Sequence, residues 1–429
     1  MDKNLDHIET EEKQKALLIC IQYPEMDKNE AGTHIQELES LVDTMGAETV
    51  GTMVVPLKKR SSKYLIGTGK ADEILDLAED LDAELIIFDD ELSPAQQRNL
   101  EELTEKCVID RHEVILDIFA GRATTKEAVL QVGLARMEYS LPRLTRAWTH
   151  LSRQKGGTKG TRGEGETQLE VDRRIILNKI TKLKKELNKV REHRKTLRKQ
   201  RAAVPVPTGA IVGYTNAGKS SLLNTLTGSD AFVEDKLFAT LDPTTRKVTL
   251  PGGQKFLLTD TVGFIRKLPH DLVDAFRSTL EETILADFLV HVLDISHPEV
   301  EEQYRITLEV LEDLGAGDKP MIVVFNKVDL LKNKSDRDSF GLIHPEALYI
   351  STKSGEGLET LAEKIEILLN SDKQIMNLSI PADRYDLISM IHREGTVIEE
   401  QYNNSESIIK ARVPAKAYNI LTKYIIKED

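Results

Sequence analysis

The chain has 429 residues, of which 40% are hydrophobic and 30% are charged, and its formal net charge is −13. These values are typical of a soluble globular protein with two to four domains. We expect no membrane span, because the longest apolar run, residues 285–293, is too short to cross a bilayer. Residues 1–15 are polar and acidic, so we expect no signal peptide. Cys20 and Cys107 show neither metal-ligand spacing nor a disulfide framework, which favours a cytoplasmic protein.

The first part of the chain, residues 1–122, alternates between short apolar runs and amphipathic stretches. The amphipathic stretches have the period of a helix, and the apolar runs have the length of buried strands. A β-α-β-α-β pattern of this kind predicts a small parallel sheet covered by helices. The expected strands are residues 16–22, 49–55, 85–90 and 107–110.

Residues 123–203 are predicted to form a basic helical hairpin. Two helical stretches flank a glycine-rich basic loop at residues 156–167. The second stretch, from Gln168 to about Arg201, carries apolar residues at alternating spacings of four and three, which is typical of a short coiled coil. From Arg143 to Arg201 there are 19 Lys or Arg and 6 Asp or Glu, a net charge of +13. Such a basic segment in an acidic protein indicates contact with a polyanion such as nucleic acid, although a solvated charged helix has the same composition.

Residues 204–370 carry the motifs of a P-loop GTPase domain. The first motif, GYTNAGKS at residues 213–220, follows an apolar strand and precedes an apolar-periodic helix. Its glycines allow backbone N–H groups to surround a β-phosphate at the positive end of that helix. Lys219 would neutralise the β- and γ-phosphates, and the hydroxyl of Ser220 would bind Mg²⁺.

The second motif runs from Asp260 to Gly263, at the end of the strand KFLLTD. An Asp in this position holds the Mg²⁺ shell, and the amide of the Gly can sense the γ-phosphate. The segment LFATLDPTTRK between the two motifs occupies the position of switch I. Thr240 is predicted to complete the Mg²⁺ shell, with Thr244 and Thr245 as alternatives.

Two further strand-end motifs predict that the base is guanine. The run from Asn326 to Asp329 follows the strand MIVVFN, and a buried Asp carboxylate there accepts hydrogen bonds from guanine N1–H and its 2-amino group, which adenine cannot offer. Leaving such a carboxylate unpaired is costly, so the motif discriminates strongly between bases. Residues 351–353 stand at the end of the strand ALYIST and are placed to offer backbone donors to guanine O6.

The sequence does not determine which group positions the attacking water for GTP hydrolysis. Phe264 follows Gly263, where Ras-like proteins place the Gln that orients the attacking water. Either Phe264 merely packs, or the GTPase is intrinsically slow and its water is positioned by another group. Asn216 is a candidate K⁺ ligand, because GTPases with Asn at that loop position and no catalytic Gln resemble those that use K⁺ as a fixed positive charge.

Three weaker signals carry alternative interpretations. The run from Ile66 to Lys70 looks like a fragment of a phosphate loop, but it lacks the full spacing and is explained by a strand-to-helix turn. Trp148 lies among basic residues; it either stacks on a base or, as we prefer, anchors a helix in a hydrophobic groove. The ten histidines show no paired metal-ligand spacing, so the sequence does not support a catalytic metal other than Mg²⁺.

Residues 371–429 follow the GTPase region and are predicted to form a small α+β domain. The expected order is strand, helix, strand, strand, helix. The full prediction is therefore an α/β chain with a parallel N-terminal domain, a basic helical hairpin, a P-loop GTPase domain and this C-terminal domain.

The segment GTRGEGETQLEVDRR at residues 160–174 precedes a basic helix and then the phosphate loop. Together with FATLDPTTR at residues 238–246 and the stretch at residues 260–282, it closely resembles the HflX family of translational GTPases. The resemblance covers about residues 16–370 and is less distinctive in the tail. The glycine-rich segment is specific, because ordinary small GTPases have nothing similar.

The resemblance implies a GTPase that binds the large ribosomal subunit, through rRNA and ribosomal proteins, and splits stalled or idle ribosomes, with GTP hydrolysis resetting the factor. It implies Mg²⁺ bound by Ser220 and Thr240, and guanine read by Asn326 and Asp329. We expect a cytoplasmic monomer without stable membrane insertion. The alternative function is a GTP-dependent RNA-binding switch that acts outside the ribosome.

The predicted sites are then as follows. The candidate RNA contacts at the tip of the hairpin are Arg153, Lys155, Lys159 and Arg162. The predicted GTP-binding residues are Gly213, Tyr214, Thr215, Asn216, Ala217, Gly218, Lys219, Ser220, Phe238, Ala239, Thr240, Leu241, Asp242, Asp260, Thr261, Val262, Gly263, Asn326, Lys327, Val328, Asp329, Ser351, Thr352 and Lys353.

Overall fold

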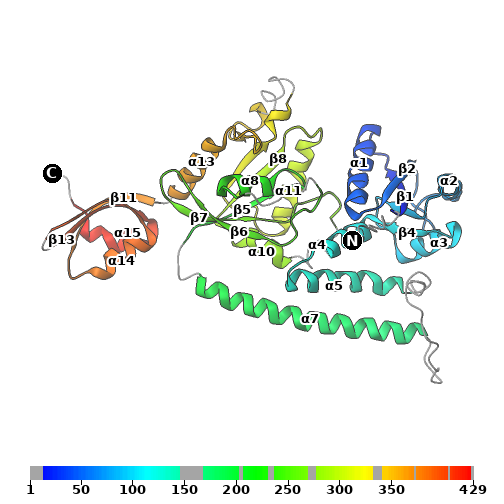
Figure 1. Ribbon diagram of the computed structural model, residues 1–429, viewed down its shortest axis with the longest axis horizontal. Coiled ribbons are helices and arrows are strands. Elements are labelled where there is room, and N and C mark those ends of the chain that lie inside the picture. The colour runs from blue at the N-terminus through cyan, green and yellow to red at the C-terminus, as the bar shows by residue number, and fades with distance from the viewer. Residues whose placement is uncertain are drawn as a thin grey trace, which may run out of the picture. The chain divides into compact units, whose positions relative to one another are not determined.

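Three β-sheets, each with its own apolar core, organise the chain in the computed structural model (Figure 1). Contacts between Cα atoms divide it into two compact units. One unit holds residues 1–189 with the short segments 235–239 and 268–276, and the other holds the remainder. The structure describes residues 13–144, 168–201, 206–229, 236–268, 277–331, 341–371, 373–403 and 406–426.

The N-terminal sheet is parallel throughout, with strand order β2-β1-β3-β4, as the alternating pattern predicts. Helices α1 and α4 pack together on one face, and α2 and α3 cover the other (Figure 1). The strands are β1 Lys15–Gln22, β2 Glu48–Pro56, β3 Leu85–Phe88 and β4 Cys107–Asp110, and the helices are α1 Lys28–Met45, α2 Thr68–Asp80, α3 Pro94–Thr104 and α4 Arg111–Arg122.

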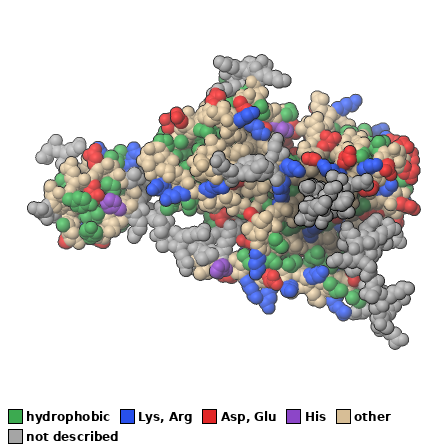
Figure 2. Space-filling view, in the orientation of Figure 1, with side chains coloured by type: hydrophobic (Ala, Val, Ile, Leu, Met, Phe, Trp, Pro, Cys, Tyr) green, Lys and Arg blue, Asp and Glu red, His purple; other side chains and the backbone are tan. Residues whose placement is uncertain are grey.

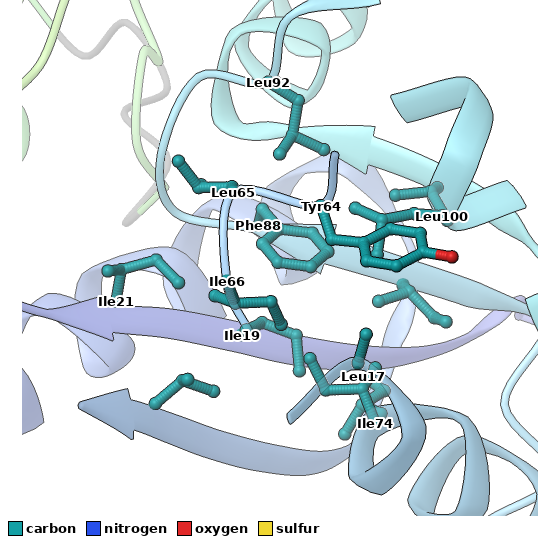
Figure 3. Close-up of a cluster of buried hydrophobic side chains, with 14 of the residues drawn as sticks. Leu17, Ile19, Ile21, Tyr64, Leu65, Ile66, Ile74, Phe88, Leu92 and Leu100 are labelled. Carbon is teal, nitrogen blue, oxygen red and sulfur yellow. The ribbon is translucent and has the colours of Figure 1, made fainter. Parts of the chain in front are cut away.

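The larger core of this domain lies between the sheet and helices α2 and α3. Figure 3 shows the ring of Phe88 beside Leu65 and Tyr64, with Ile74 approaching from α2. Successive side chains of a strand point to opposite faces, so Ile19 enters this core while its neighbour in β1 faces α1. The Ile66–Lys70 run leads into α2, which begins at Thr68, and the Lys70 ammonium pairs with Glu73 one turn further along this helix.

A helical hairpin follows, made of α5 Lys126–Ser140, the short η1 Leu141–Arg143 and α7 Gln168–Arg201. The two long helices lie side by side, and Lys184 of α7 pairs with Glu138 of α5 at 2.8 Å (Figure 1). The predicted seam of α7 faces inward, since Ile180 and Leu187 are buried. Lys and Arg side chains gather along its outer surface (Figure 2). The glycine-rich loop lies outside the described residues.

The GTPase domain contains a six-stranded sheet with order β10-β9-β8-β5-β7-β6, in which only β6 runs antiparallel to its neighbour. Parallel strands end at one edge of a sheet, so the loops after β5, β7, β9 and β10 gather there. The elements are β5 Thr208–Gly213, α8 Lys219–Thr227, β6 Thr244–Thr249, β7 Lys255–Asp260, α10 Arg277–Leu285, β8 Phe288–Asp294, α11 Val300–Asp313, β9 Met321–Asn326, η2 Val328–Leu330, β10 Leu348–Tyr349 and α13 Leu358–Asn370.

The C-terminal domain has the predicted order of strand, helix, strand, strand, helix. Its antiparallel sheet has order β11-β13-β12, and Leu387, Ile391 and Leu421 from the two helices cover one face. No helix in the described ranges is long and apolar enough to cross a membrane. The elements are β11 Lys373–Pro381, α14 Tyr385–Glu394, β12 Thr396–Tyr402, β13 Glu406–Pro414, α15 Ala415–Leu421 and η3 Thr422–Tyr424.

Candidate functional site

The phosphate loop connects the end of β5 to the start of α8. Gly213 and Gly218 have φ angles of 144° and 95°, a region that L side chains rarely adopt. A Cβ on Gly213 would lie 2.1 Å from the carbonyl oxygen of Val292, and one on Gly218 would lie 2.2 Å from Nδ2 of Asn326. The loop therefore requires glycine at both positions, for its backbone angles and for the close approach of neighbouring atoms.

Lys219 begins α8 and is buried. Its Nζ donates a hydrogen bond to the carbonyl oxygen of Tyr214 at 2.6 Å. Burial lowers the pKa of Lys219 to about 8, and the nearby carboxylate of Asp260 opposes that shift. A buried cation at the positive end of a helix is poorly hydrated, so this arrangement favours binding of a polyanion such as a phosphate chain.

Three oxygen-bearing side chains meet beside the loop. The hydroxyls of Ser220 and Thr240 donate to Oδ2 of Asp260 at 2.6 and 2.9 Å, and the two hydroxyl oxygens lie 2.8 Å apart. Burial raises the pKa of Asp260, while Lys219 and the two hydroxyls lower it. Oδ1 of Asp260 is buried and makes no hydrogen bond within the described residues. Clustered hard oxygen atoms and an unused carboxylate oxygen fit a Mg²⁺ ion.

The geometry also separates the three threonines that the sequence leaves as alternatives for this cluster. Of the three, Thr240 is the one whose hydroxyl contacts the side chains of Ser220 and Asp260, whereas Thr244 meets Asp260 only as its ladder partner between β6 and β7. Thr244 is exposed on β6, and Thr245 pairs with the hydroxyl of Thr259 across the β6–β7 ladder at 2.9 Å. Position along the chain could not distinguish them, because all three lie in the short segment before β7.

Phe264 is buried with 1% of its surface exposed. Its backbone pairs with the phosphate loop: Thr215 N–H donates to the carbonyl of Phe264 at 2.8 Å, and Phe264 N–H donates to that of Gly213 at 3.1 Å. The side chain therefore packs and offers no group that orients water. Asn216, by contrast, is exposed and has a left-handed φ of 59°.

Asn326 ties the phosphate loop to the two motifs predicted to read the base. Its Nδ2 donates to the carbonyl of Ala217 at 2.9 Å, and its Oδ1 accepts from the N–H of Thr352 at 3.1 Å. Ser351 is buried and donates its hydroxyl to Oδ1 of Asp329 at 2.6 Å. Asp329 itself is exposed, contrary to the expected buried carboxylate, because the surface turn η2 carries it.

One interaction at this edge was not predicted. Lys327 has a φ of 66° and its Nζ pairs with Asp294 at 2.7 Å. Asp294 is the last residue of β8. The acidic residue at the end of the apolar run LADFLVHVLD is the sequence feature from which this ion pair could have been predicted. The pair fixes the strained backbone from which Asp329 projects.

Some predicted residues lie elsewhere. The ring of Phe238 is buried and contacts Phe119 of α4 edge to face, with centroids 4.7 Å apart. Thr261 is buried and its hydroxyl donates to the carbonyl of Ile211, so its side chain supports the sheet. Trp148 and the four candidate RNA contacts lie outside the described residues. These contacts are Arg153, Lys155, Lys159 and Arg162.

Comparisons of the chain with known proteins show the family to which it belongs. Residues 32–120 match the family profile described as GTP-binding GTPase N-terminal, residues 122–201 match the GTP-binding GTPase Middle Region, and residues 208–327 match the 50S ribosome-binding GTPase. The GTPase HflX of Akkermansia muciniphila is 48% identical over 423 residues, which are 96% of this chain and 97% of that protein. The chain belongs to the HflX family of GTPases.

A second curated relative agrees with this assignment to the HflX family. The GTPase HflX of Escherichia coli K12 is 41% identical over 393 residues, covering 91% of this chain and 92% of that protein. Among solved structures, a GTP-binding protein from the hyperthermophilic archaeon Sulfolobus solfataricus in complex with GDP is 26% identical, covers 83% of this chain and 99% of its own, and has a TM-score of 0.44. As a member of the HflX family, the protein is a GTPase.

Proposed function

We propose that this GTPase binds the large ribosomal subunit in its GTP state and splits or recycles stalled or idle ribosomes, with hydrolysis resetting the factor. The observation that carries the proposal is the match of residues 208–327 to the 50S ribosome-binding GTPase family, within a chain that belongs to HflX along nearly its full length. The basic helix α7 supports it, because rRNA is a polyanion. Such a factor would act in the cytoplasm, as a monomer.

In this proposal the nucleotide is held by the motifs that meet at the edge of the GTPase sheet. The backbone from Gly213 to Ser220 would surround the phosphates, and Ser220 and Thr240 would bind Mg²⁺, with Asp260 behind them. Bound Mg²⁺ supplies positive charge to the β- and γ-phosphates. Asp329 would accept hydrogen bonds from guanine, and residues 351–353 would offer N–H groups to its O6.

Thr240 connects nucleotide state to ribosome affinity in this scheme. It lies in the switch I segment, and its hydroxyl already joins the Ser220–Asp260 cluster. A γ-phosphate would fix this segment through the same hydroxyl, and hydrolysis would release it. A segment that is ordered only with GTP would shift the population toward the conformation that binds the ribosome.

The hairpin would supply the contact with rRNA. Lys179, Lys182 and Lys185 are exposed on α7, and Lys182 and Lys185 lie on the side away from the buried Ile180 and Leu187. Phosphate contacts from such side chains give most of the affinity for RNA and make it dependent on salt. Four basic residues within and just before the glycine-rich loop, Arg153, Lys155, Lys159 and Arg162, would extend this contact at the tip.

Potassium would supply the missing catalytic charge. The support is that Phe264 is buried, whereas Asn216 is exposed on the phosphate loop. GTP turnover is measured in KCl and in NaCl at equal ionic strength, with and without ribosomes. Faster turnover in KCl that is abolished in Asn216→Ala supports K⁺ activation, and equal turnover in the two salts under both conditions refutes it.

The ribosome assignment is tested by co-sedimentation of the full chain with purified bacterial ribosomes on sucrose gradients. Migration with the large subunit in the presence of a non-hydrolysable GTP analogue but not GDP, with loss of the intact-ribosome peak, is the expected result. Absence of nucleotide-dependent association with either subunit would remove the ribosome from the function. Nucleotide-dependent binding to free RNA alone would then favour the RNA switch acting outside the ribosome.

A further inference from the structure

A buried cluster of three ligand-type side chains lies in the N-terminal domain, away from the GTPase motifs in the sequence. Cys20 comes from β1, His34 from α1, and Asp89 directly follows β3. One sulfur, one imidazole nitrogen and one carboxylate oxygen from these residues all lie within 4.8 Å of one another. Cys20 and Asp89 have no exposed surface, and His34 is 5% exposed. The three therefore converge inside the domain.

The register of the sheet brings two of them together. Ile19 of β1 pairs with Phe88 of β3, and the N–H of Asp89 donates to the carbonyl of Ile19 at 2.9 Å. The next pair along these parallel strands is Cys20 and Asp89. Since Ile19 and Phe88 belong to the core shared with α2 and α3, the following side chains point to the opposite face, toward α1 and α4.

Helix α1 supplies the third member. Its inward stripe contains Ala31, His34, Ile35 and Leu38, at the spacing of one helix face. His34 is the one imidazole in an otherwise apolar stripe of this helix, and it lies over the carboxyl ends of β1 and β3. In the strand order β2-β1-β3-β4, the connection from β1 leads to one side of the sheet and the later strands are added on the other side, so β1 and β3 form the topological switch point. Open parallel α/β sheets usually bind ligands beyond the carboxyl ends of the strands at such a point.

Charged groups behind the three side chains orient them. Oδ2 of Asp89 lies 3.9 Å from Nδ1 of His34, while Oδ1 accepts a hydrogen bond from Arg111 at 2.7 Å. Nε2 of His34 lies 3.8 Å from the carboxylate of Glu30. A metal-bound histidine usually gives its other ring nitrogen to a carboxylate, and a metal-bound carboxylate is usually held by a further hydrogen bond. Glu30 and Arg111 stand in these two positions.

The charges also favour a cation. Arg111 contacts two carboxylates, Asp89 and Glu37, and is itself buried. Asp89 therefore shares its guanidinium partner with a second acid, and it lies where water screens charge poorly. A divalent cation would compensate the charge of the Asp89 carboxylate together with that of the Cys20 thiolate, whose proton is released when a metal binds.

We propose that Cys20, His34 and Asp89 bind a divalent metal ion of the zinc class. A sulfur, an imidazole nitrogen and a carboxylate oxygen are the donors that Zn²⁺ takes in proteins, at bond lengths of about 2.0–2.3 Å. Water would complete a tetrahedral set of four ligands. The site belongs to the N-terminal domain, needs no guanine nucleotide and is independent of the ribosome proposal. A bound ion would join α1 to β1 and to the end of β3.

Cobalt titration of the full chain tests the proposal. The protein is stripped with a chelator and titrated with Co²⁺, because a thiolate bound to Co²⁺ gives a charge-transfer absorption in the near ultraviolet. The oxygen ligands of the Mg²⁺ cluster give no such band. We expect the band to saturate at one equivalent and to disappear when Zn²⁺ is added. No band in the wild-type chain overturns the proposal.

The two cysteines provide a matched pair of variants. Cys20→Ser should remove the charge-transfer band, and Cys107→Ser should keep it, because Cys107 lies at the start of β4. Glu30→Gln should weaken Co²⁺ binding about 10-fold or more, as loss of a carboxylate behind a metal-bound histidine does. Glu30 is half exposed, so this change leaves the fold intact. Glu39→Gln on the same helix is its control, and equal affinities for both variants would contradict the assigned ligand geometry.

Discussion

Asn326 joins segments that lie more than 100 residues apart through one side-chain amide. Its nitrogen donates to Ala217 in the phosphate loop, and its oxygen accepts from Thr352 after β10. The side chain is buried, so each lost hydrogen bond would leave an unsatisfied polar group at a cost of about 1–3 kcal/mol. The shape of the phosphate loop and the position of the base-reading motifs therefore depend on one residue.

Gly218→Ala should abolish this arrangement. The new Cβ would lie 2.2 Å from Nδ2 of Asn326, at a backbone φ of 95° that an L side chain resists. Strain of about 1–3 kcal/mol and the disrupted hydrogen bonds of Asn326 should weaken nucleotide binding by at least about 100-fold. The measurement is titration with a fluorescent GDP analogue.

Gly228→Ala is the matched control for that variant. Gly228 ends α8 with a φ of 61°, but a Cβ there would meet no atom within 4 Å. It should lose about 1 kcal/mol of stability and keep its nucleotide affinity. Equal loss of affinity in both variants would show that the contact with Asn326 is not the specific cause of the loss.

His291 makes the GTPase domain sensitive to acid. It is fully buried in β8 and stacks on Tyr304, with ring centroids 5.2 Å apart. Burial, with smaller contributions from the positive charge of Lys219 and from His344, lowers its pKa from the ordinary 6.5 to about 3. At a pH between these two pKa values, His291 is therefore protonated in the unfolded chain and neutral in the folded chain. The contribution of neutral His291 to the free energy of unfolding is fully present above the pKa of this histidine in the unfolded chain. It is lost by about 1.4 kcal/mol per pH unit as the pH falls from there toward the pKa in the folded chain.

His291→Phe should keep the ring stacking and remove this loss. Urea unfolding of the full chain at about pH 7 and about pH 5 should show a wild-type loss from His291 of about 2 kcal/mol in the GTPase-domain transition, absent in the variant. His193→Phe, at an exposed position of α7, should retain the wild-type loss. If the free energy of unfolding of His291→Phe falls as much between the two pH values as that of the wild type, other groups cause the acid sensitivity.

At the scale of elements, local periodicity predicted most of the fold. The expected start and end of α7 coincide with Gln168–Arg201, and the four N-terminal strands lie within two residues of their predicted bounds. The phosphate loop could be predicted because glycine, lysine and serine must stand at fixed spacing around a phosphate. These features depend only on near neighbours in the chain. The division into four domains remains a prediction.

Features that need two distant segments were not predictable in this way. The sequence favoured Thr240 but left Thr244 and Thr245 as alternatives, because the choice depends on where switch I folds back on Asp260. Cys20 and His34 have no recognisable spacing, because they converge only when α1 packs on the sheet. Burial of His291 depends on the neighbouring Tyr304 of α11. Spacing along the chain gives no signal for such tertiary contacts.

Helix α7 allows the rRNA contact to be tested by charge alone. Lys182→Gln combined with Lys185→Gln removes two exposed charges without touching the buried seam. If both contact phosphates, the slope of log affinity against log salt for the large subunit should fall by about 1.5. Lys58→Gln with Lys59→Gln removes the same charge from an exposed loop after β2 and should leave the slope unchanged. Equal slopes in all proteins would exclude α7 from the contact.

At the scale of the whole molecule, charge is distributed unevenly. The segment from Arg143 to Arg201 carries +13, so the rest of the chain carries −26 to give the net −13. If the protein binds rRNA as proposed, rRNA would attract the basic segment and repel the acidic remainder of the chain, which favours one orientation on the ribosome. Binding in a single orientation would allow the nucleotide site to respond to the ribosome.

Ribosome and GTP should therefore each strengthen binding of the other by the same factor. If a non-hydrolysable GTP analogue tightens binding to the large subunit relative to GDP, thermodynamic linkage requires the subunit to improve the preference for that analogue over GDP equally. Coupling of this kind is typically about 5–150-fold. Both ratios are measured by equilibrium titration of the full chain at one salt concentration. Thr240→Ala should reduce the two ratios together toward one, because it removes the hydroxyl through which switch I senses the γ-phosphate. If the variant weakens GTP binding but keeps the coupling, the signal to the ribosome passes through another segment.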